Sequence, residues 1–100
     1  MKTILTCEDN RFQIVVSGRF TTDEATGFLK EIDTAMQAKN AEIVMELSEL
    51  DFISSAGIRC FVMLLKSCTA NASTLRLKNL TPQLKDIFTM TALLDKFNVE

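Results

Sequence analysis

The residues with the clearest chemistry in this sequence are two adjacent serines, Ser54 and Ser55, in the stretch DFISSAGIRCF (residues 51–61). They follow an apolar pair and precede a strongly apolar run. A serine in this position commonly caps a helix, because its hydroxyl oxygen accepts a hydrogen bond from a backbone N–H two or three residues later. One hydroxyl is enough for a cap, so the other is available for chemistry such as phosphorylation.

The residues after the serines favour a phosphate at this position. Ala56 and Gly57 are small, so no bulky side chain shields the serines or the amides of the first turn. Arg59 stands in the first turns, where the helix dipole disfavours a cation but a guanidinium would pair with a phosphate. A helix N-terminus tolerates added negative charge. Phosphorylation would therefore leave the fold intact and weaken the binding of a partner at this surface.

Groups suited to catalysis are scarce. The sequence contains no His, Trp or Tyr, which excludes Ser–His and Cys–His pairs and every His-containing metal site. It also contains no Gly-rich phosphate loop and no G-x-S-x-G motif. We therefore expect a protein that is not an enzyme and that has no catalytic residue, metal or cofactor of its own.

Length and composition predict one globular domain over residues 1–100, with 47% hydrophobic and 24% charged residues. A net charge of −2 without a basic cluster argues against nucleic-acid binding. No apolar run is long enough to span a bilayer, and the first residues do not resemble a signal peptide. We expect a cytoplasmic protein without membrane insertion. Its thiols, Cys7, Cys60 and Cys68, lack metal-ligand spacing and are expected to be reduced and mostly buried.

The first third of the chain predicts a hairpin and a helix. Residues 3–8 and 12–18 read as two strands across a polar turn. Thr21 and Glu24 have the spacing of a capping box, and Asp23 adds negative charge that the helix dipole favours. The apolar residues expected on one face of each element are Phe12, Ile14 and Val16 in the second strand, and Ala25, Phe28, Leu29, Ile32, Ala35 and Met36 in the helix.

The middle of the chain places the two serines. Residues 42–47 are nearly continuously apolar, which predicts a strand buried on both faces. Residues 48–55 read as a loop, and a second helix follows at about residues 56–69. The side chains of Met36, Met45 and Met63 are expected to fill the core. The serines therefore lie where a strand passes into a helix, and such strand ends are where α/β proteins build sites.

The last third predicts one more strand and one more helix. Residues 74–80 alternate apolar and charged side chains, as expected near a sheet edge. Thr81 as a cap and Pro82 in the first helical position start a third helix, with Leu84, Ile87 and Phe88 facing inward. Residues 91–99 are interpreted as a turn of helix and a short strand. The order β-β-α-β-α-β-α predicts an α/β domain whose mixed, mostly parallel sheet carries packed helices.

The stretch IVMELSELDFISSAGIRCFVML (residues 43–64) resembles the signature of the STAS domain family, the bacterial anti-sigma factor antagonists. VVSGRFTTDEA (residues 15–25) resembles the family's second strand and its turn into the first helix, with Gly18 in the family's glycine position. LTPQLKDIFTMTALLDKF (residues 80–97) resembles the family's final helix. The resemblance spans nearly the whole chain and implies a STAS-like fold.

The resemblance also implies a switch. In the family, the serine two residues before the glycine, here Ser55, accepts phosphate from a partner anti-sigma factor that is also a serine kinase. The unphosphorylated chain would bind this partner and release a sigma factor, phosphorylation would end the binding, and a serine phosphatase would restore it. ATP and magnesium would belong to the kinase. The residues expected to bind the partner are Thr21, Asp23, Ser54, Ser55, Ala56, Gly57, Ile58 and Arg59, of which Asp23, Ile58 and Arg59 are chosen as surface residues near Ser55.

Two positions depart from the family pattern. Many members have Asp immediately before the phosphorylated serine, where this chain has Ser54, and the family often has Asp where this chain has Thr21. Ser54 is therefore a rival phosphoacceptor. Some STAS proteins are instead unphosphorylated binding subunits of transporters or scaffold complexes, and this alternative stays open at the level of the sequence.

Overall fold

The computed structural model describes residues 1–90 and, for the backbone, residues 98–99. Its elements in chain order are β1 (Lys2–Glu8), β2 (Arg11–Phe20), the 3-10 turn η1 (Thr22–Glu24), α1 (Ala25–Glu31), α2 (Asp33–Gln37), β3 (Glu42–Glu46), β4 (Leu50–Ile53), α3 (Ser55–Ala70), β5 (Thr74–Lys78), α4 (Pro82–Met90) and β6 (Asn98–Val99). This is the α/β fold with a mixed sheet that the sequence predicts. Residues 91–97, where we expect a turn of helix, lie outside the described residues.

The sheet has the order β1-β2-β3-β5-β6, and β4 pairs with β2 beyond the end of β3. β1 and β2 form the predicted antiparallel hairpin, while the other pairs are parallel. The hairpin turns at Asp9 and Asn10, whose φ angles of 51° and 63° are those of a tight two-residue turn that matches the twist of the strands.

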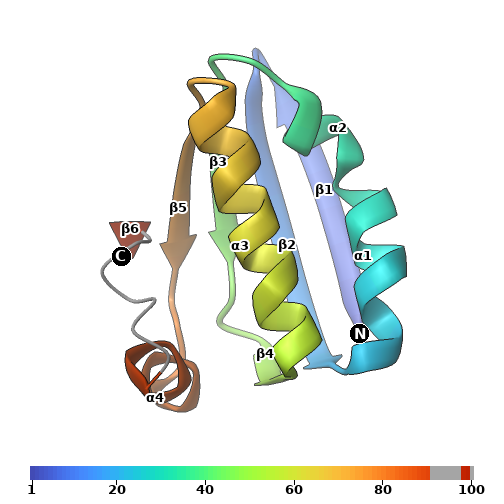
Figure 1. The fold of residues 1–100 in the computed structure, drawn as a ribbon, viewed down its shortest axis with the longest axis vertical. Helices are drawn as coiled ribbons and strands as arrows, with labels where there is room; N and C mark the ends of the chain where they lie inside the picture. The colour runs from blue at the N-terminus through green and yellow to red at the C-terminus, as the bar shows by residue number, and fades with distance from the viewer. Residues whose placement is uncertain (91–97, 100) are drawn as a thin grey trace.

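Helices α1, α2 and α3 lie on one face of the sheet, and α4 lies near the end to which the parallel strands point (Figure 1). Because one face is free of these helices, β3 is buried on one side only. Ile43 and Met45 are buried, whereas Glu42, Val44 and Glu46 are half-exposed. The prediction of a strand buried on both faces is therefore wrong, since an apolar run cannot show that a sheet is covered on a single side.

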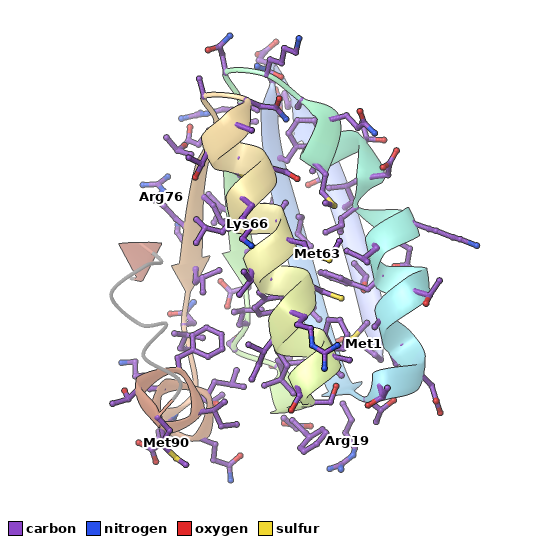
Figure 2. All side chains as sticks on the ribbon, viewed as in Figure 1. Met1, Arg19, Met63, Lys66, Arg76 and Met90 are labelled. Carbon is purple, nitrogen blue, oxygen red and sulfur yellow. The ribbon has the colours of Figure 1, made fainter. Side chains whose placement is uncertain are left out.

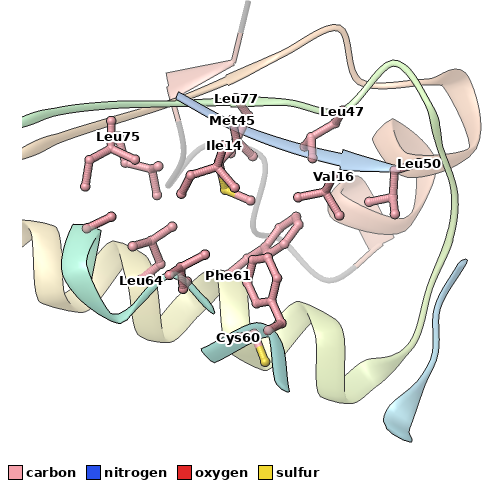
Figure 3. Packing of buried hydrophobic residues seen from close by; sticks show 14 of the residues in the cluster. Ile14, Val16, Met45, Leu47, Leu50, Cys60, Phe61, Leu64, Leu75 and Leu77 are labelled. Carbon is pink, nitrogen blue, oxygen red and sulfur yellow. The ribbon is translucent and has the colours of Figure 1, made fainter. Parts of the chain in front are cut away.

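The core lies between the helices and the sheet (Figure 3), and it contains most of the residues predicted to face inward. Buried phenylalanines connect the layers. The ring centroid of Phe20 on β2 lies 4.8 Å from that of Phe28 on α1 and 6.0 Å from that of Phe61 on α3. Phe61 in turn lies 6.2 Å from Phe88 on α4. Such edge-to-face aromatic pairs add stabilisation beyond the area that they bury.

Two further predictions are wrong in their details. The stretch predicted to be a loop contains β4. Leu50 and Ile53 of this strand are buried, but the exposed Asp51 between them interrupts the apolar pattern, so the strand was missed. The predicted capping box is absent. The Thr21 side chain makes no capping hydrogen bond, and the Glu24 carboxylate instead lies 3.7 Å from the amino group of Met1.

The first predicted helix is divided into η1, α1 and α2, with a break at Ile32 (φ −99°, ψ 8°). Its predicted inward face is nevertheless confirmed, because Phe28, Ile32 and Ala35 are buried. The start of α4 is confirmed as well, since the Thr81 hydroxyl accepts a hydrogen bond from the backbone N–H of Leu84 at 3.3 Å.

Candidate functional site

The two serines lie at the end of the sheet where the parallel strands terminate, as expected for a site in an α/β protein. The chain leaves β4 at Ile53, passes through Ser54 and enters α3 at Ser55. The backbone N–H of Ser54 donates a hydrogen bond to the carbonyl oxygen of Phe20 at 2.8 Å. This bond ties the start of α3 to the end of β2 and so fixes where both hydroxyls lie.

Ser54 is the residue that caps the helix. Its backbone is extended, with φ −81° and ψ 169°, and its hydroxyl oxygen accepts a hydrogen bond from the backbone N–H of Gly57 at 3.1 Å. Its side chain is only partly exposed. A cap of this kind contributes about 1 kcal/mol to stability.

Ser55 is the first residue of α3 and is exposed. Among residues 1–90 its hydroxyl has no hydrogen-bond partner. The first backbone N–H groups of a helix have no intrahelical acceptor. The Ser54 hydroxyl oxygen accepts a hydrogen bond from only one of them, the N–H of Gly57. The N–H groups of Ser55 and Ala56 are left for water or a ligand. The structure thus divides the roles of the two serines, which the sequence left open.

The structure requires a glycine at position 57 for a different reason from the one expected from the sequence. It is buried, and a Cβ atom built on it would lie 2.7 Å from Cγ1 of Ile53 and 2.9 Å from Cδ1 of Phe20. Distances that short are steric clashes. The glycine therefore allows α3 to approach the sheet closely, and it does not serve to uncover the first-turn amides.

Arg59 is exposed and forms no ion pair with the described residues. It lies one turn after Ser55 on the same side of α3, where side chains four residues apart are neighbours. Ile58 is half-buried and packs against the core. Cys60, which follows Arg59, is buried, and this burial raises the pKa of its thiol even though Arg59 opposes the shift.

Thr21 and Asp23 lie close to this site, because η1 packs beside α3. Thr21 is half-buried with an extended backbone, and Asp23 is exposed in the first turn of η1. The structure therefore gathers the predicted partner-binding residues at one end of the molecule, around the start of α3.

One feature at the same end was missed at the level of the sequence. The guanidinium of Arg19 lies 4.6 Å from the ring centroid of Phe52, within the range of a cation–π contact. Figure 2 shows Arg19 beyond the start of α3. The pairing of Arg19 with Phe52 on neighbouring strands brings them together, and no local pattern indicates it once β4 is read as a loop.

The described residues contain no cluster of His, Cys, Asp or Glu that could hold a metal ion. None of the helices within them is long and apolar enough to cross a membrane.

Comparison with known proteins places these features in context. The family model described as "Mlab, STAS domain" matches residues 5–97. No curated protein sequence is significantly similar to the chain. Among solved structures, an anti-sigma-factor antagonist (STAS) domain protein of Planctomyces limnophilus is 17% identical, with a TM-score of 0.85 over 98% of this chain and 87% of that chain.

A second similar structure is known in two states. The anti-sigma factor antagonist SpoIIAA in its unphosphorylated form is 18% identical, with a TM-score of 0.83 over 99% of this chain and 88% of that chain. The phosphorylated form of the Bacillus protein is 19% identical, with a TM-score of 0.77 over 99% of this chain and 91% of that chain. At these identities the similarity establishes the fold.

Proposed function

The chain belongs to the STAS domain family, and on that premise we propose that it is an anti-sigma factor antagonist controlled by phosphorylation of Ser55. Unphosphorylated, it binds an anti-sigma factor that is also a serine kinase, so that a sigma factor becomes available. Phosphorylation ends this binding, and a serine phosphatase restores it. The chain is a substrate of these enzymes and catalyses no reaction itself.

The observation that carries the proposal is the division of roles between the two serines. Ser54 already uses its hydroxyl oxygen as the cap of α3, whereas the Ser55 hydroxyl is exposed at the first helical position. A kinase can reach Ser55 without opening the helix. The similar protein SpoIIAA, which has a phosphorylated and an unphosphorylated form, supports the same reading.

The transfer requires nothing from this chain beyond the hydroxyl. The Ser55 oxygen bonds to the γ-phosphorus of ATP, the bond from that phosphorus to the bridging oxygen breaks, and ADP leaves. The hydroxyl proton passes to a base on the kinase. The product adds about 1.5 to 2 negative charges at the helix N-terminus, where the dipole stabilises them. Its effect therefore falls on the partner and not on the fold.

The experiment that tests the proposal is intact-mass analysis after incubation with MgATP and the anti-sigma factor kinase encoded nearest to this gene. Wild type and Ser54→Ala should each gain one phosphate, and Ser55→Ala should gain none. A phosphate that persists in Ser55→Ala and disappears in Ser54→Ala would assign the acceptor role to Ser54. A wild-type chain that binds the kinase tightly but gains no phosphate would refute the switch.

A second function remains in view, a STAS binding subunit of a transporter or scaffold complex that is not phosphorylated. The matched family model is described as "Mlab, STAS domain", a description that does not mention anti-sigma factors. This chain also has Ser54 and Thr21 where many antagonists have acidic residues. Stable co-purification with a transporter ATPase, without any phosphate on Ser55, would favour this second function.

A further inference from the structure

Strand β1 forms one edge of the sheet and lacks the features that usually protect an edge strand. Proteins commonly protect such an edge by a very short strand, a proline, a bulge or a charged side chain in its middle. β1 has seven residues and no proline, and it pairs with β2 in an unbroken register. Its central residues 3–7 (TILTC) are uncharged. The strand at the other end of the sheet order, β6, has only two residues. β1 is therefore open to pairing with a further strand.

The backbone groups that point out of this edge follow from the hydrogen bonds on the other side of β2. The N–H of Gly18 donates to the carbonyl oxygen of Glu49 at 2.9 Å, and the carbonyl oxygen of Asn10 accepts from the N–H of Glu42 at 3.2 Å. Even-numbered residues along β2 therefore bond away from β1, and odd-numbered residues bond toward it. The odd-numbered residues of β2 lie opposite the even-numbered residues of β1. The residues of β1 whose N–H and C=O groups point outward are consequently Thr3, Leu5 and Cys7.

The charges at the two ends of β1 fit a second copy of the same strand. Lys2 and Glu8 are exposed, and neither forms an ion pair among residues 1–90. Both side chains point to the same face of the sheet, because side chains alternate along a strand. An antiparallel second β1 with Leu5 opposite Leu5 places Lys2 opposite Glu8 of the second copy, and Glu8 opposite its Lys2. Opposite charges in such cross-strand pairs are stabilising.

Other registers lose this fit. A shift by one residue would set outward-pointing backbone groups against groups that already bond to β2, and it would turn side chains to the wrong face. A shift by two residues places Lys2 opposite Thr6, or Glu8 opposite Ile4, and leaves the other charge beyond the end of the partner strand. The register centred on Leu5 uses all seven residues. It also places Ile4, which is 44% exposed, against Thr6 of the second copy.

We propose that the chain forms a symmetric dimer in which β1 pairs antiparallel with β1 of a second copy, with Leu5 opposite Leu5. The two sheets join into one continuous sheet through the outward groups of Thr3, Leu5 and Cys7. Because the interface has two-fold symmetry, every contact in it occurs twice. β1 lies on the opposite side of β2 from β4, the strand that leads to Ser54. The pairing therefore does not use the strand that positions the serines, and it does not rest on the proposed function.

Charge reversal tests the register, with sedimentation equilibrium as the measurement. Wild type should show a reversible monomer–dimer equilibrium. Lys2→Glu places Glu opposite Glu at both ends of the strand pair and should raise the dimer dissociation constant at least about tenfold. The double variant Lys2→Glu, Glu8→Lys restores both pairs and should return to within about threefold of wild type. Lys85→Glu, the same change at an exposed site on α4, should dimerise as wild type does. Circular dichroism confirms that each variant is folded.

Disulfide trapping tests the same register independently. In a Cys7→Ser background, chains with Lys2→Cys are mixed with chains with Glu8→Cys and oxidised. The two positions would face each other in a pair with Cα atoms about 4.5 Å apart, which a disulfide can bridge. The mixture should therefore form a covalent dimer. Neither variant should do so alone, because two copies of one position lie about 20 Å apart along the strands. Cys60 and Cys68 are buried.

Each result either supports or refutes the dimer. A wild-type chain that stays monomeric at every concentration up to its solubility limit refutes it. A dimer that ignores the charge reversal at Lys2, or a mixture that forms no disulfide, shows that β1 is not the interface and refutes the proposal as well. Phosphate transfer to Ser55 is measured separately, so failure of the dimer and failure of the proposed function are distinguishable.

Discussion

Adding one methyl group at Gly57 should destabilise the protein, although glycine is the poorest residue other than proline for a helix interior. The new Cβ atom would lie 2.7 Å from Cγ1 of Ile53 and 2.9 Å from Cδ1 of Phe20. These neighbours are 4% and 0% exposed, so they cannot yield without moving the core. Overpacking of this kind costs about 1 to 3 kcal/mol.

The helix itself opposes this cost, because Gly→Ala gains about 1 kcal/mol in a helix interior. With a clash near the upper end of the range, Gly57→Ala should lower the free energy of unfolding by about 1 to 2 kcal/mol. Gly27 on α1 is the matched control. It is exposed, and a Cβ atom there would meet nothing within 4 Å. Gly27→Ala should therefore raise stability by about 0.5 to 1 kcal/mol.

Urea unfolding measures both changes, provided that the slope of unfolding free energy against urea stays constant. The two midpoints should move in opposite directions from that of wild type. If the Gly57→Ala midpoint equals or exceeds the wild-type value, the close approach of α3 to the sheet does not require glycine, and our account of Gly57 is wrong. If Gly27→Ala does not raise the stability, only the expected gain in helix propensity is wrong, and the steric account of Gly57 is unaffected.

Three further outcomes are expected. Ser54→Ala should lower the free energy of unfolding by about 1 kcal/mol through loss of the cap, and Ser55→Ala should change it little; thermal unfolding of the two variants would show equal losses if the roles were not divided. Ala72 has a φ of 57°, a conformation that glycine adopts at lower cost, so Ala72→Gly should raise the urea midpoint by the equivalent of about 1 kcal/mol, and a lower midpoint would contradict this. Hydrogen bonding by Arg11 and the nearby positive charges hold the pKa of Glu42 below its usual 4.5, so the ionised carboxylate stabilises the fold fully above that pH, and this stabilisation is lost as the pH falls through the lowered pKa. When unfolding is followed from neutral to acidic pH, Glu42→Gln should lose less stability than wild type does. Equal losses of stability would exclude this contribution of Glu42.

Local patterns in the sequence were sufficient for the elements that bury a clear apolar face. The hairpin, the inward face of the first helical region and the cap at Thr81 all follow from spacings of a few residues, which is the range over which propensity and capping act. The position of the serines at a strand end followed from the same patterns.

Features that depend on tertiary neighbours could not be predicted in this way. β4 exists because it pairs with β2, and its four residues, interrupted by the exposed Asp51, give no signal of their own. Met63 looked like a core residue because it belongs to an apolar helix, yet its side chain is 46% exposed. The roles of Ser54 and Ser55 were open because either hydroxyl could cap, and only the start of α3 at Ser55 decides between them.

That division of roles determines what a phosphate at this site can do. If the capping serine were modified, the modification would remove the acceptor of the Gly57 N–H, and the switch would act by destabilising α3. Ser55 carries no such bond, so phosphorylation there would leave the cap in place and would not act through the contact at Gly57 or the core. The electrostatic effect of the phosphate would then act on partner binding, and each ~1.4 kcal/mol of repulsion weakens that binding tenfold. A chain that must cycle repeatedly between two states without unfolding is best switched at the residue that the fold does not use.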